Sequence, residues 1–296
     1  MSQTLTALAP AKLNLFLHVV GRRPDGYHLL QTVFVLLDLA DSIRFTLRND
    51  GTIRRVSDLS GVSEADDLVV RAAMALKREA ERNSATGDGG SVPGADIEVE
   101  KRIPMGGGLG GGSSDAATTL ITLNAMWKLG FSREKLRELG LALGADVPFF
   151  VFGQDAFAEG IGERLRAVDL PQWWYLVLTP PVHVSTPLVF GHPELTRDTF
   201  PLKITDFSDH SLVNMKNDLQ AVVLKEFPMV SRYFEALRNV SQKSVFGARM
   251  TGSGACVFAA FELEEDARMA FQELASNYKG FVARGLSRHA LFDPAW

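Results

Sequence analysis

The chain has 296 residues and a formal net charge of −4, with 46% hydrophobic and 22% charged residues. This composition is typical of a folded protein with one large or two ordinary domains, and the charge argues against a broad nucleic-acid-binding face. The single cysteine, Cys256, excludes an intrachain disulfide and a multi-cysteine metal site. The N-terminus lacks the pattern of a signal peptide, and no apolar run is long enough to span a membrane. We therefore expect a cytoplasmic protein that binds neither nucleic acid nor membrane.

The first predicted element is a strand at residues 11–19, where the side chains alternate between two faces. One face is uniformly apolar and is expected to lie in the core: Ala11, Leu13, Leu15, Leu17 and Val19. The opposite face is too polar for an ordinary buried face, and either meets solvent or floors a polar cleft: Lys12, Asn14, Phe16 and His18. A lysine on such a strand either extends its ammonium group to solvent or meets an anion.

A turn signal at 22–26 precedes Tyr27 and His28. These two side chains, and Phe190 further on, either stack on a planar ligand or fill the core. The next elements are predicted as strands at 32–38 and 42–48, a helix at 68–80 after a run of acidic residues, an exposed loop at 83–95, and a strand at 96–103.

The most informative segment is the glycine-rich loop 104–114, Pro-Met-Gly-Gly-Gly-Leu-Gly-Gly-Gly-Ser-Ser, which is followed by a helix predicted at 113–129. Successive glycines let backbone N–H groups point inward around an anion, and a helix start adds free N–H donors, so the loop predicts a phosphate site. No lysine follows the glycines, which excludes a Walker-type P-loop, and the surroundings do not suit a Rossmann loop. A flexible Gly/Ser linker is the alternative, but Met105, Leu109 and the flanking elements argue against it.

The rest of the chain predicts a helix at 132–143, strand-like segments at 149–152 and 173–179, helices near 211–225 and 229–239, two strands within 248–261 joined by a glycine turn at 251–254, a helix at 264–277 and a strand near 281–284. This order indicates an α+β fold with a second domain. We expect the domain boundary between residues 155 and 180, and no internal repeat is visible.

Two more residues have either a chemical or a plain structural role. Asp146 lies in Gly144-Ala-Asp-Val-Pro148, just past a predicted helix end, where aspartate commonly forms turns. Cys256 lies in an apolar strand, where burial is favoured over nucleophilic chemistry. The histidines show no metal-ligand spacing with a carboxylate, so no metal-ligating residue of the protein is predicted.

Taken together, these motifs resemble a known family. Residues 104–117, the glycine loop with Asp-Ala-Ala after it, are similar to the ATP-binding motif of the GHMP kinases. Residues 251–256, Thr-Gly-Ser-Gly-Ala-Cys, resemble the C-terminal glycine motif of that family. Within the family, residues 10–17, 25–29 and 144–148 are similar to members that phosphorylate a cytidyl-linked alcohol, and all matches occur in the expected order.

The resemblance implies an α+β, two-domain GHMP kinase fold with the active site in the cleft between the domains. Residues 1–165 would form the N-terminal ATP-binding domain, which resembles ribosomal protein S5, and residues 166–296 a ferredoxin-like C-terminal domain. The expected ligands are ATP, Mg²⁺ and a small cytidyl substrate, and the expected assembly is a monomer or a homodimer.

The resemblance also implies residue roles. Asp146 would be the general base that takes the proton from the substrate hydroxyl, and Lys12 would stabilise charge there and orient the aspartate. The ATP phosphates would be held by Pro104, Met105, Gly106, Gly107, Gly108, Leu109, Gly110, Gly111, Gly112, Ser113 and Ser114. The cytidyl substrate would contact Asn14, Tyr27, His28, Thr186 and Phe190, with Tyr27, His28 and Phe190 at the base.

Two acidic residues stand near these motifs. Asp67 occupies a position where the family pattern has an asparagine on the adenine side; an ionised acid accepts a hydrogen bond from the adenine amino group but cannot donate one. Asp115, at the start of the helix after the loop, brings negative charge near the phosphates. We expect a structural, capping role for Asp115.

Two alternatives stay open at this stage. A homoserine-type or mevalonate-type kinase would not need the aromatic residues Tyr27, His28 and Phe190, because its alcohol is small and aliphatic. A nucleotide-binding regulatory protein that had lost its chemistry would be expected to lack Lys12 or Asp146, and both residues are present.

Overall fold

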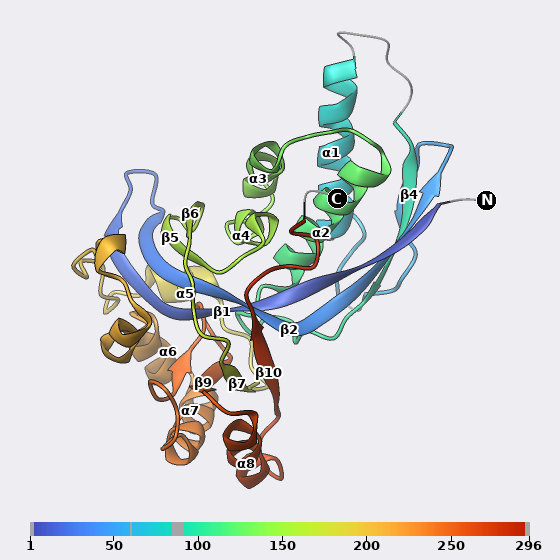
Figure 1. Cartoon of the computed structure of the whole chain (residues 1–296). Coiled ribbons are helices and arrows are strands. Elements are labelled where there is room, and N and C mark those ends of the chain that lie inside the picture. Colours follow the sequence, from blue (N-terminus) through green and yellow to red (C-terminus); the bar gives the residue numbers. More distant parts are fainter. Residues whose placement is uncertain (1–2, 60, 85–91, 294–296) are drawn as a thin grey trace.

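The computed structural model describes residues 3–59, 61–84 and 92–293, which fold into an α+β structure (Figure 1). Residues 85–91 of the loop expected at 83–95 lie outside these ranges, and the prediction is wrong at both ends, because residues 83–84 end a helix (Leu68–Ser84) and residues 94–95 begin a strand (Gly94–Glu100). None of the helices in the described ranges has the length and apolar character needed to cross a membrane.

The described strands form one ten-stranded sheet. They are β1 (Thr4–Arg22), β2 (His28–Arg48), β3 (Ile53–Arg55), β4 (Gly94–Glu100), β5 (Ala156–Gly160), β6 (Arg164–Ala167), β7 (Trp174–Leu178), β8 (Arg249–Met250), β9 (Val257–Phe261) and β10 (Gly280–Leu286). Their order is β3-β4-β2-β10-β7-β9-β8, with β1 and the β5–β6 hairpin also paired along β2. The β3–β4 pair is parallel and the other pairs of named strands are antiparallel.

The helices in the described ranges are α1 (Leu68–Ser84), α2 (Gly111–Met126), α3 (Arg133–Leu141), α4 (Val147–Phe152), α5 (Thr186–Gly191), α6 (Gln220–Glu226), α7 (Pro228–Val240) and α8 (Glu264–Leu274). Two 3-10 turns, η1 (Ile204–Asp206) and η2 (Asp209–Asn214), precede α6. In Figure 1, α1 to α4 lie on one side of the long β1–β2 pair, and α6 to α8 lie with β7 and β9 at the other end of the molecule.

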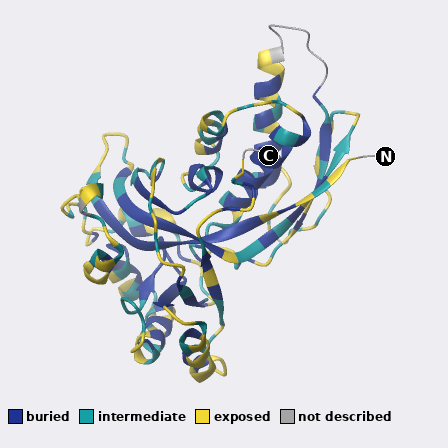
Figure 2. Cartoon of the chain, viewed as in Figure 1, coloured by how far each residue is buried: buried dark blue, intermediate teal, exposed yellow. Residues whose placement is uncertain are grey.

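The core follows this division, as the buried regions in Figure 2 show. One apolar cluster joins α1, α2 and α4 to β2 and β4, and a second joins β7 and β9 to α6, α7 and α8. A third lies between them along β1 and β2 and includes the fully buried Phe16 and Phe157. The two ends are therefore connected by continuous packing through the β1–β2 pair.

The domain boundary near residue 165 stays a prediction. In the structure this position falls inside β6 (Arg164–Ala167), the outer strand of the β5–β6 hairpin. We propose that the N-terminal unit includes all of β6, since a division within the strand would separate residues that pair with β5.

Several predicted elements differ from the structure. The strands expected at 32–38 and 42–48 are one continuous strand, β2, and the helix expected from residue 113 begins at Gly111. The strand expected at 149–152 is wrong, because these residues belong to helix α4. Pro148 fits the first turn of that helix, and Gly153, at φ 77°, ends it in the left-handed conformation.

The predicted alternation of residues 11–19 also fails in part. The register between β1 and β2 shifts between Asn14 and Leu17, which indicates an irregularity of the bulge type. As a result Lys12 and Asn14 line a polar cleft, as one alternative predicted, but so does Leu17. Phe16 and His18 are buried and are absent from the lining of that cleft.

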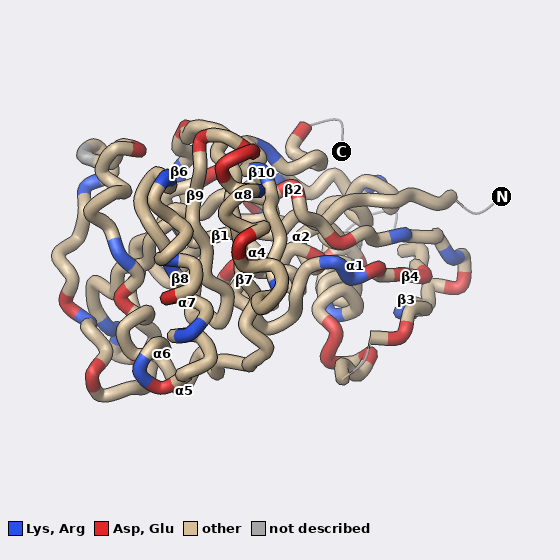
Figure 3. The backbone as a smooth tube through the Cα atoms, turned by 90° about the horizontal axis from the view of Figure 1, so that it is seen from below, with Lys and Arg blue, Asp and Glu red and all other residues tan. Residues whose placement is uncertain are grey.

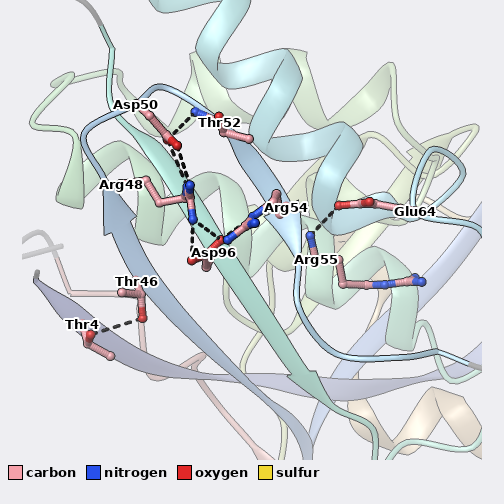
Figure 4. A network of polar contacts seen from close by, with 9 residues as sticks. All are labelled: Thr4, Thr46, Arg48, Asp50, Thr52, Arg54, Arg55, Glu64 and Asp96. Atoms are coloured by element: carbon pink, nitrogen blue, oxygen red, sulfur yellow. Dashed lines mark hydrogen bonds and ion pairs between the residues drawn. The ribbon is translucent and has the colours of Figure 1, made fainter.

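Charged side chains link β2 and β4 to β3, the strand at one edge of the sheet (Figure 4). Arg48 on β2 donates to both carboxylate oxygens of Asp96 on β4 at 3.1 and 3.0 Å, and Arg54 on β3 donates to Asp96 at 3.0 Å. Figure 3 shows that Lys and Arg residues are interspersed with Asp and Glu residues along the chain. Such charges discourage further strand pairing at an edge.

Candidate active site

The glycine loop lies between β4 and α2 and takes a conformation that requires glycine. Gly106, Gly108 and Gly110 have φ angles of 73°, 79° and 75°, in the left-handed region. Gly110 occupies the N-cap position of α2 without a side-chain cap, so amide groups of the first turn have no side-chain partner there. This geometry fits the predicted phosphate site.

The loop is held from two sides. The Lys12 N–H on β1 donates to the carbonyl oxygen of Leu109 at 3.0 Å, and the Cys256 N–H donates to that of Gly107 at 3.1 Å. A Cβ atom at Gly108 would lie 2.7 Å from the carbonyl oxygen of Thr251, so the two glycine motifs meet backbone to backbone. Cys256 itself is buried, and burial raises the pKa of its thiol to about 12.

Lys12 and Asp146 form an ion pair. The Lys12 side chain is 3% exposed, and its Nζ lies 3.2 Å from Asp146 Oδ2. The same Nζ donates to Asn14 Oδ1 at 2.6 Å. Asp146 occupies the N-cap position of α4 but caps no N–H, and its side chain is 34% exposed, which leaves the carboxylate accessible to a ligand. The two predicted catalytic residues are therefore in contact.

A cleft of about 660 Å³ opens over this pair, and half of the predicted site residues line it. The predicted residues that line it are Lys12, Asn14, Tyr27, His28, Gly108, Ser113, Asp146, Thr186 and Phe190. The other loop residues, 104–107, 109–112 and 114, do not line it. Among them, Ser114 has a fully buried hydroxyl with no hydrogen-bond partner in the described part of the chain.

The lining of the cleft also includes aromatic residues. The rings of His28 and Phe190 lie 5.0 Å apart between centroids at an angle of 35°, and Tyr27 is 60% exposed beside them. At the side of the cleft, the Thr186 hydroxyl lies 2.7 Å from that of Ser253, so α5 is joined to the C-terminal glycine turn. These contacts bring residues from three distant segments to one wall.

Arg197 lies behind this wall, outside the lining of the cleft, and no sequence motif predicted it. Its Nε donates to His28 Nε2 at 3.1 Å, and its Nη2 donates to the carbonyl oxygens of Phe190, at 2.9 Å, and His192, at 2.8 Å. Burial, then the charges of Arg197 and Arg22, lower the pKa of His28. No local sequence pattern marks Arg197, because its partner His28 lies 169 positions away.

Asp67 and Asp115 have structural partners. Asp67 accepts from Arg55 at 2.7 Å through Oδ2 and from the Val69 N–H at 2.9 Å through Oδ1, which caps the start of α1. It is absent from the lining of the cleft. Asp115 is buried and pairs with Lys101 at 2.7 Å, so it is not a cap of α2.

The comparisons with known proteins agree with this geometry. Residues 67–154 match the GHMP kinases N terminal domain, and residues 203–280 match the GHMP kinases C terminal domain. The chain belongs to the GHMP kinases and is an ATP-dependent kinase.

Full-length relatives narrow this class. A protein of Nitrosospira multiformis named 4-diphosphocytidyl-2-C-methyl-D-erythritol kinase is 57% identical over 98% of this chain and 94% of its own length. A protein of the same name from Aromatoleum aromaticum is 55% identical over 96% and 94%. The chain is thus a member of the 4-diphosphocytidyl-2-C-methyl-D-erythritol kinase family.

Solved structures give the same result. The crystal structure of a 4-(cytidine 5'-diphospho)-2C-methyl-D-erythritol kinase is 33% identical, with a TM-score of 0.78 over 95% of this chain and 99% of that one. A mevalonate kinase structure, 14% identical with a TM-score of 0.65, covers 96% of this chain and all of its own, and shows the shared fold alone. The two-domain GHMP kinase architecture predicted from the sequence is confirmed.

Proposed function

We propose that the protein transfers the γ-phosphoryl group of ATP to the 2-hydroxyl of 4-diphosphocytidyl-2-C-methyl-D-erythritol. The products are the 2-phosphate and ADP, in the non-mevalonate (methylerythritol phosphate) route to isoprenoid precursors. The names of the full-length relatives support the substrate. The main structural support is one cleft whose lining includes the Lys12–Asp146 pair, Gly108 of the glycine loop and the His28–Phe190 pair.

Phosphoryl transfer requires mainly positioning and charge stabilisation from the protein. Asp146 accepts the proton of the substrate hydroxyl as the oxygen attacks the γ-phosphorus. The Lys12 ammonium, 3.2 Å from Asp146, orients that carboxylate and offsets negative charge on the attacking oxygen. Asn14 holds Lys12 through its Oδ1 and is itself held because its Nδ2 donates to Thr32 at 3.0 Å.

The backbone N–H groups of residues 104–114 and the first turn of α2 hold the ATP phosphates in this proposal, and the buried Ser114 hydroxyl is an additional donor. Mg²⁺ fits as an ion carried by the phosphates, because the described residues include no group of three acidic, histidine or cysteine side chains that could hold it alone. When bound with ATP, the ion offsets the charge of the transferring group.

The aromatic end of the cleft selects the cytidyl part of the substrate. Tyr27 and Phe190 offer ring faces for stacking on the base, and His28 offers a ring nitrogen to its polar edge. Stacking of a base on an aromatic side chain contributes about 1–3 kcal/mol in nucleic-acid binders. A small aliphatic alcohol would leave this end of the cleft empty. The cytoplasmic location and the assembly as a monomer or homodimer stay predictions.

A coupled assay of ADP release tests the proposal with three alcohols: cytidine-diphospho-methylerythritol, homoserine and mevalonate. We expect turnover with the first alcohol and none above background with the other two. Turnover with homoserine or mevalonate, without turnover of the cytidyl alcohol, would contradict the substrate assignment.

A further inference from the structure

A cluster of three charged residues lies directly beneath the glycine loop. Asp41 on β2 is completely buried, Lys101 lies between β4 and the loop, and Asp115 is in the second turn of α2. Lys101 Nζ contacts both carboxylates, which joins β2 to α2. A Cβ atom at Gly111, the first residue of α2, would lie 3.2 Å from that Nζ, so the cluster adjoins the predicted phosphate site.

Asp41 holds the chain where it enters the loop. Its Oδ1 accepts from the N–H of Arg102 at 2.6 Å and from that of Ile103 at 2.8 Å, and its Oδ2 accepts from Lys101. Both oxygens are therefore satisfied, by three donors in total. Asp115 holds the segment that leaves the loop, through its bond with Lys101. The two ends of the loop are thus tied to one partly buried lysine and one buried carboxylate.

Asp115 accepts fewer hydrogen bonds than Asp41 does. Its Oδ2 accepts from Lys101 at 2.7 Å, but its Oδ1 is buried without a hydrogen-bond partner in the described part of the chain. One ammonium faces two carboxylates, so the fully ionised cluster carries excess negative charge in a buried position. A proton relieves that excess most easily at Asp115, because Asp41 already has its donors. Burial, assisted by Asp41 and opposed by Lys101, raises the pKa of Asp115 to about 7.

Of the described residues on α1, Val69, Ala72 and Ala73 belong to the apolar core that α1 shares with α2, and the buried acid Glu79 is paired with Lys135 on α3. β1 contributes Lys12, whose ammonium is paired with Asp146 and Asn14. Lys101 and Asp41 are the charged groups that act on the Asp115 carboxyl.

We propose that Asp41, Lys101 and Asp115 are positioning residues of the glycine loop, and that Asp115 takes up a proton from solvent when the phosphates of ATP enter that loop. The inference rests on the proposed function, because it places the ATP phosphates at residues 104–114. Phosphate charge favours the protonated form of a nearby acid, so ATP binds more tightly when Asp115 is neutral. The proton-linked part of the affinity therefore falls as the pH rises through about 7.

The substitution Asp115→Asn tests the proposal. Asparagine has nearly the same shape as aspartate and can still accept the hydrogen bond from Lys101, but it cannot ionise. Isothermal titration of ATP without the alcohol, in buffers of different ionisation enthalpy, measures the protons taken up on binding. We expect the wild type to take up more protons than the variant near pH 7, with the difference lost at about pH 5. At about pH 8 the variant should bind ATP more tightly, by up to roughly tenfold for each pKa unit that the phosphates add.

Because ATP itself titrates near neutral pH, the two proteins are compared at the same pH. Glu79→Gln is the matched control: Glu79 is also a buried acid, paired with Lys135 at 2.8 Å, but α1 and α3 hold it. The control should take up protons as the wild type does. Equal uptake by the wild type and Asp115→Asn would overturn this inference alone. Failure of the wild type to bind ATP would overturn the proposed function, and this inference with it.

Discussion

At the scale of single residues, the cleft owes its chemistry to one buried cation beside one accessible carboxylate. Lys12 is 3% exposed and paired with Asp146, which is 34% exposed. Burying a lysine is costly unless it is paired and hydrogen-bonded, and Asp146 and Asn14 together meet that requirement. The contacts with Asp146 and Asn14 therefore fix the Lys12 ammonium at the cleft, where a ligand can meet it.

Replacement of the two residues by alanine separates chemistry from nucleotide binding. Asp146→Ala should abolish phosphoryl transfer while ATP binding is largely retained, because the carboxylate acts on the alcohol. Lys12→Ala should lower kcat by a factor on the order of 10²–10⁴, with a much smaller effect on ATP affinity. Turnover and ATP dissociation constants measure both effects. Retained turnover in Asp146→Ala, or equal losses of rate and affinity in Lys12→Ala, would contradict these roles.

The state of His28 follows from its contact with Arg197. An arginine side chain only donates hydrogen bonds, so Nε2 of His28 accepts and the proton of the neutral ring is on Nδ1. Nitrogen NMR of labelled histidine should find this tautomer in the free enzyme. Arg197→Met should give a mixture of tautomers and raise KM for the cytidyl substrate about tenfold, with kcat and the KM for ATP little changed.

Lys225→Met is the control for that variant. Lys225 pairs with Glu194 at 2.6 Å and so holds the same segment from outside, without contact to His28. It should leave both the tautomer and KM unchanged. A mixture of tautomers in the wild type would exclude the orienting role of Arg197.

At the scale of elements, the glycine loop depends on close contact with the C-terminal glycine turn. A Cβ atom at Gly108 would lie 2.7 Å from the carbonyl oxygen of Thr251 and 3.1 Å from that of Gly254. Backbone atoms cannot give way as a flexible side chain does. Gly108→Ala should therefore displace the loop and weaken ATP binding at least tenfold, a loss of about 1.4 kcal/mol.

Gly130→Ala is the matched control for the loop variant. Gly130 also has a positive φ angle, 67°, but a Cβ atom there meets nothing within 4 Å. It should cost about 1 kcal/mol of stability from backbone strain alone and leave ATP affinity unchanged. Thermal unfolding and ATP titration of both variants check this pair. Equal losses of ATP affinity in the two variants would show that strain, and not the contact with Thr251, is responsible.

At the scale of the whole molecule, buried acids make stability depend on pH. Burial raises the pKa of Asp155 from 3.8 to about 7, although its Oδ1 accepts from the Leu36 N–H at 3.1 Å. Between these values the native protein keeps a proton that the unfolded chain releases. The contribution of Asp155 to stability should therefore fall as the pH rises from about 4 to about 7 and then level off, whereas the buried His289, with its pKa lowered to about 4, contributes the opposite slope.

Asp155→Asn tests this dependence, because asparagine can still accept from Leu36 but does not ionise. Relative to the wild type, the variant should therefore gain up to about 4 kcal/mol of stability between about pH 4 and pH 7, from three pKa units. The contributions of Asp115 and His289 are present in both proteins and cancel in this difference. Chemical denaturation at several pH values measures the difference, and a difference that does not change with pH would contradict the assignment.

The amino-acid sequence by itself predicted the glycine-rich phosphate loop and most of the helices and strands, and its resemblance to the GHMP kinases indicated Lys12 and Asp146 as the catalytic pair. The loop and the elements could be predicted because they depend on residue type and short spacing: glycine where positive φ is needed, and apolar alternation along a strand. The tertiary structure decided which residues meet. The register shift in β1 turned Phe16 and His18 away from the cleft, and burial on several sides favoured helix α4 over a strand.

Two contacts between residues that are distant in the sequence could not be predicted, because only the tertiary structure brings these residues together. Arg197 meets His28 across 169 positions, and Lys101 meets Asp41 across 60. Such pairs leave no periodic signal, since their chemistry appears only when the sheet brings distant strands together. The sequence identified the loop that we predict to bind phosphate, and the folded chain alone placed a buried, titratable cluster beside it.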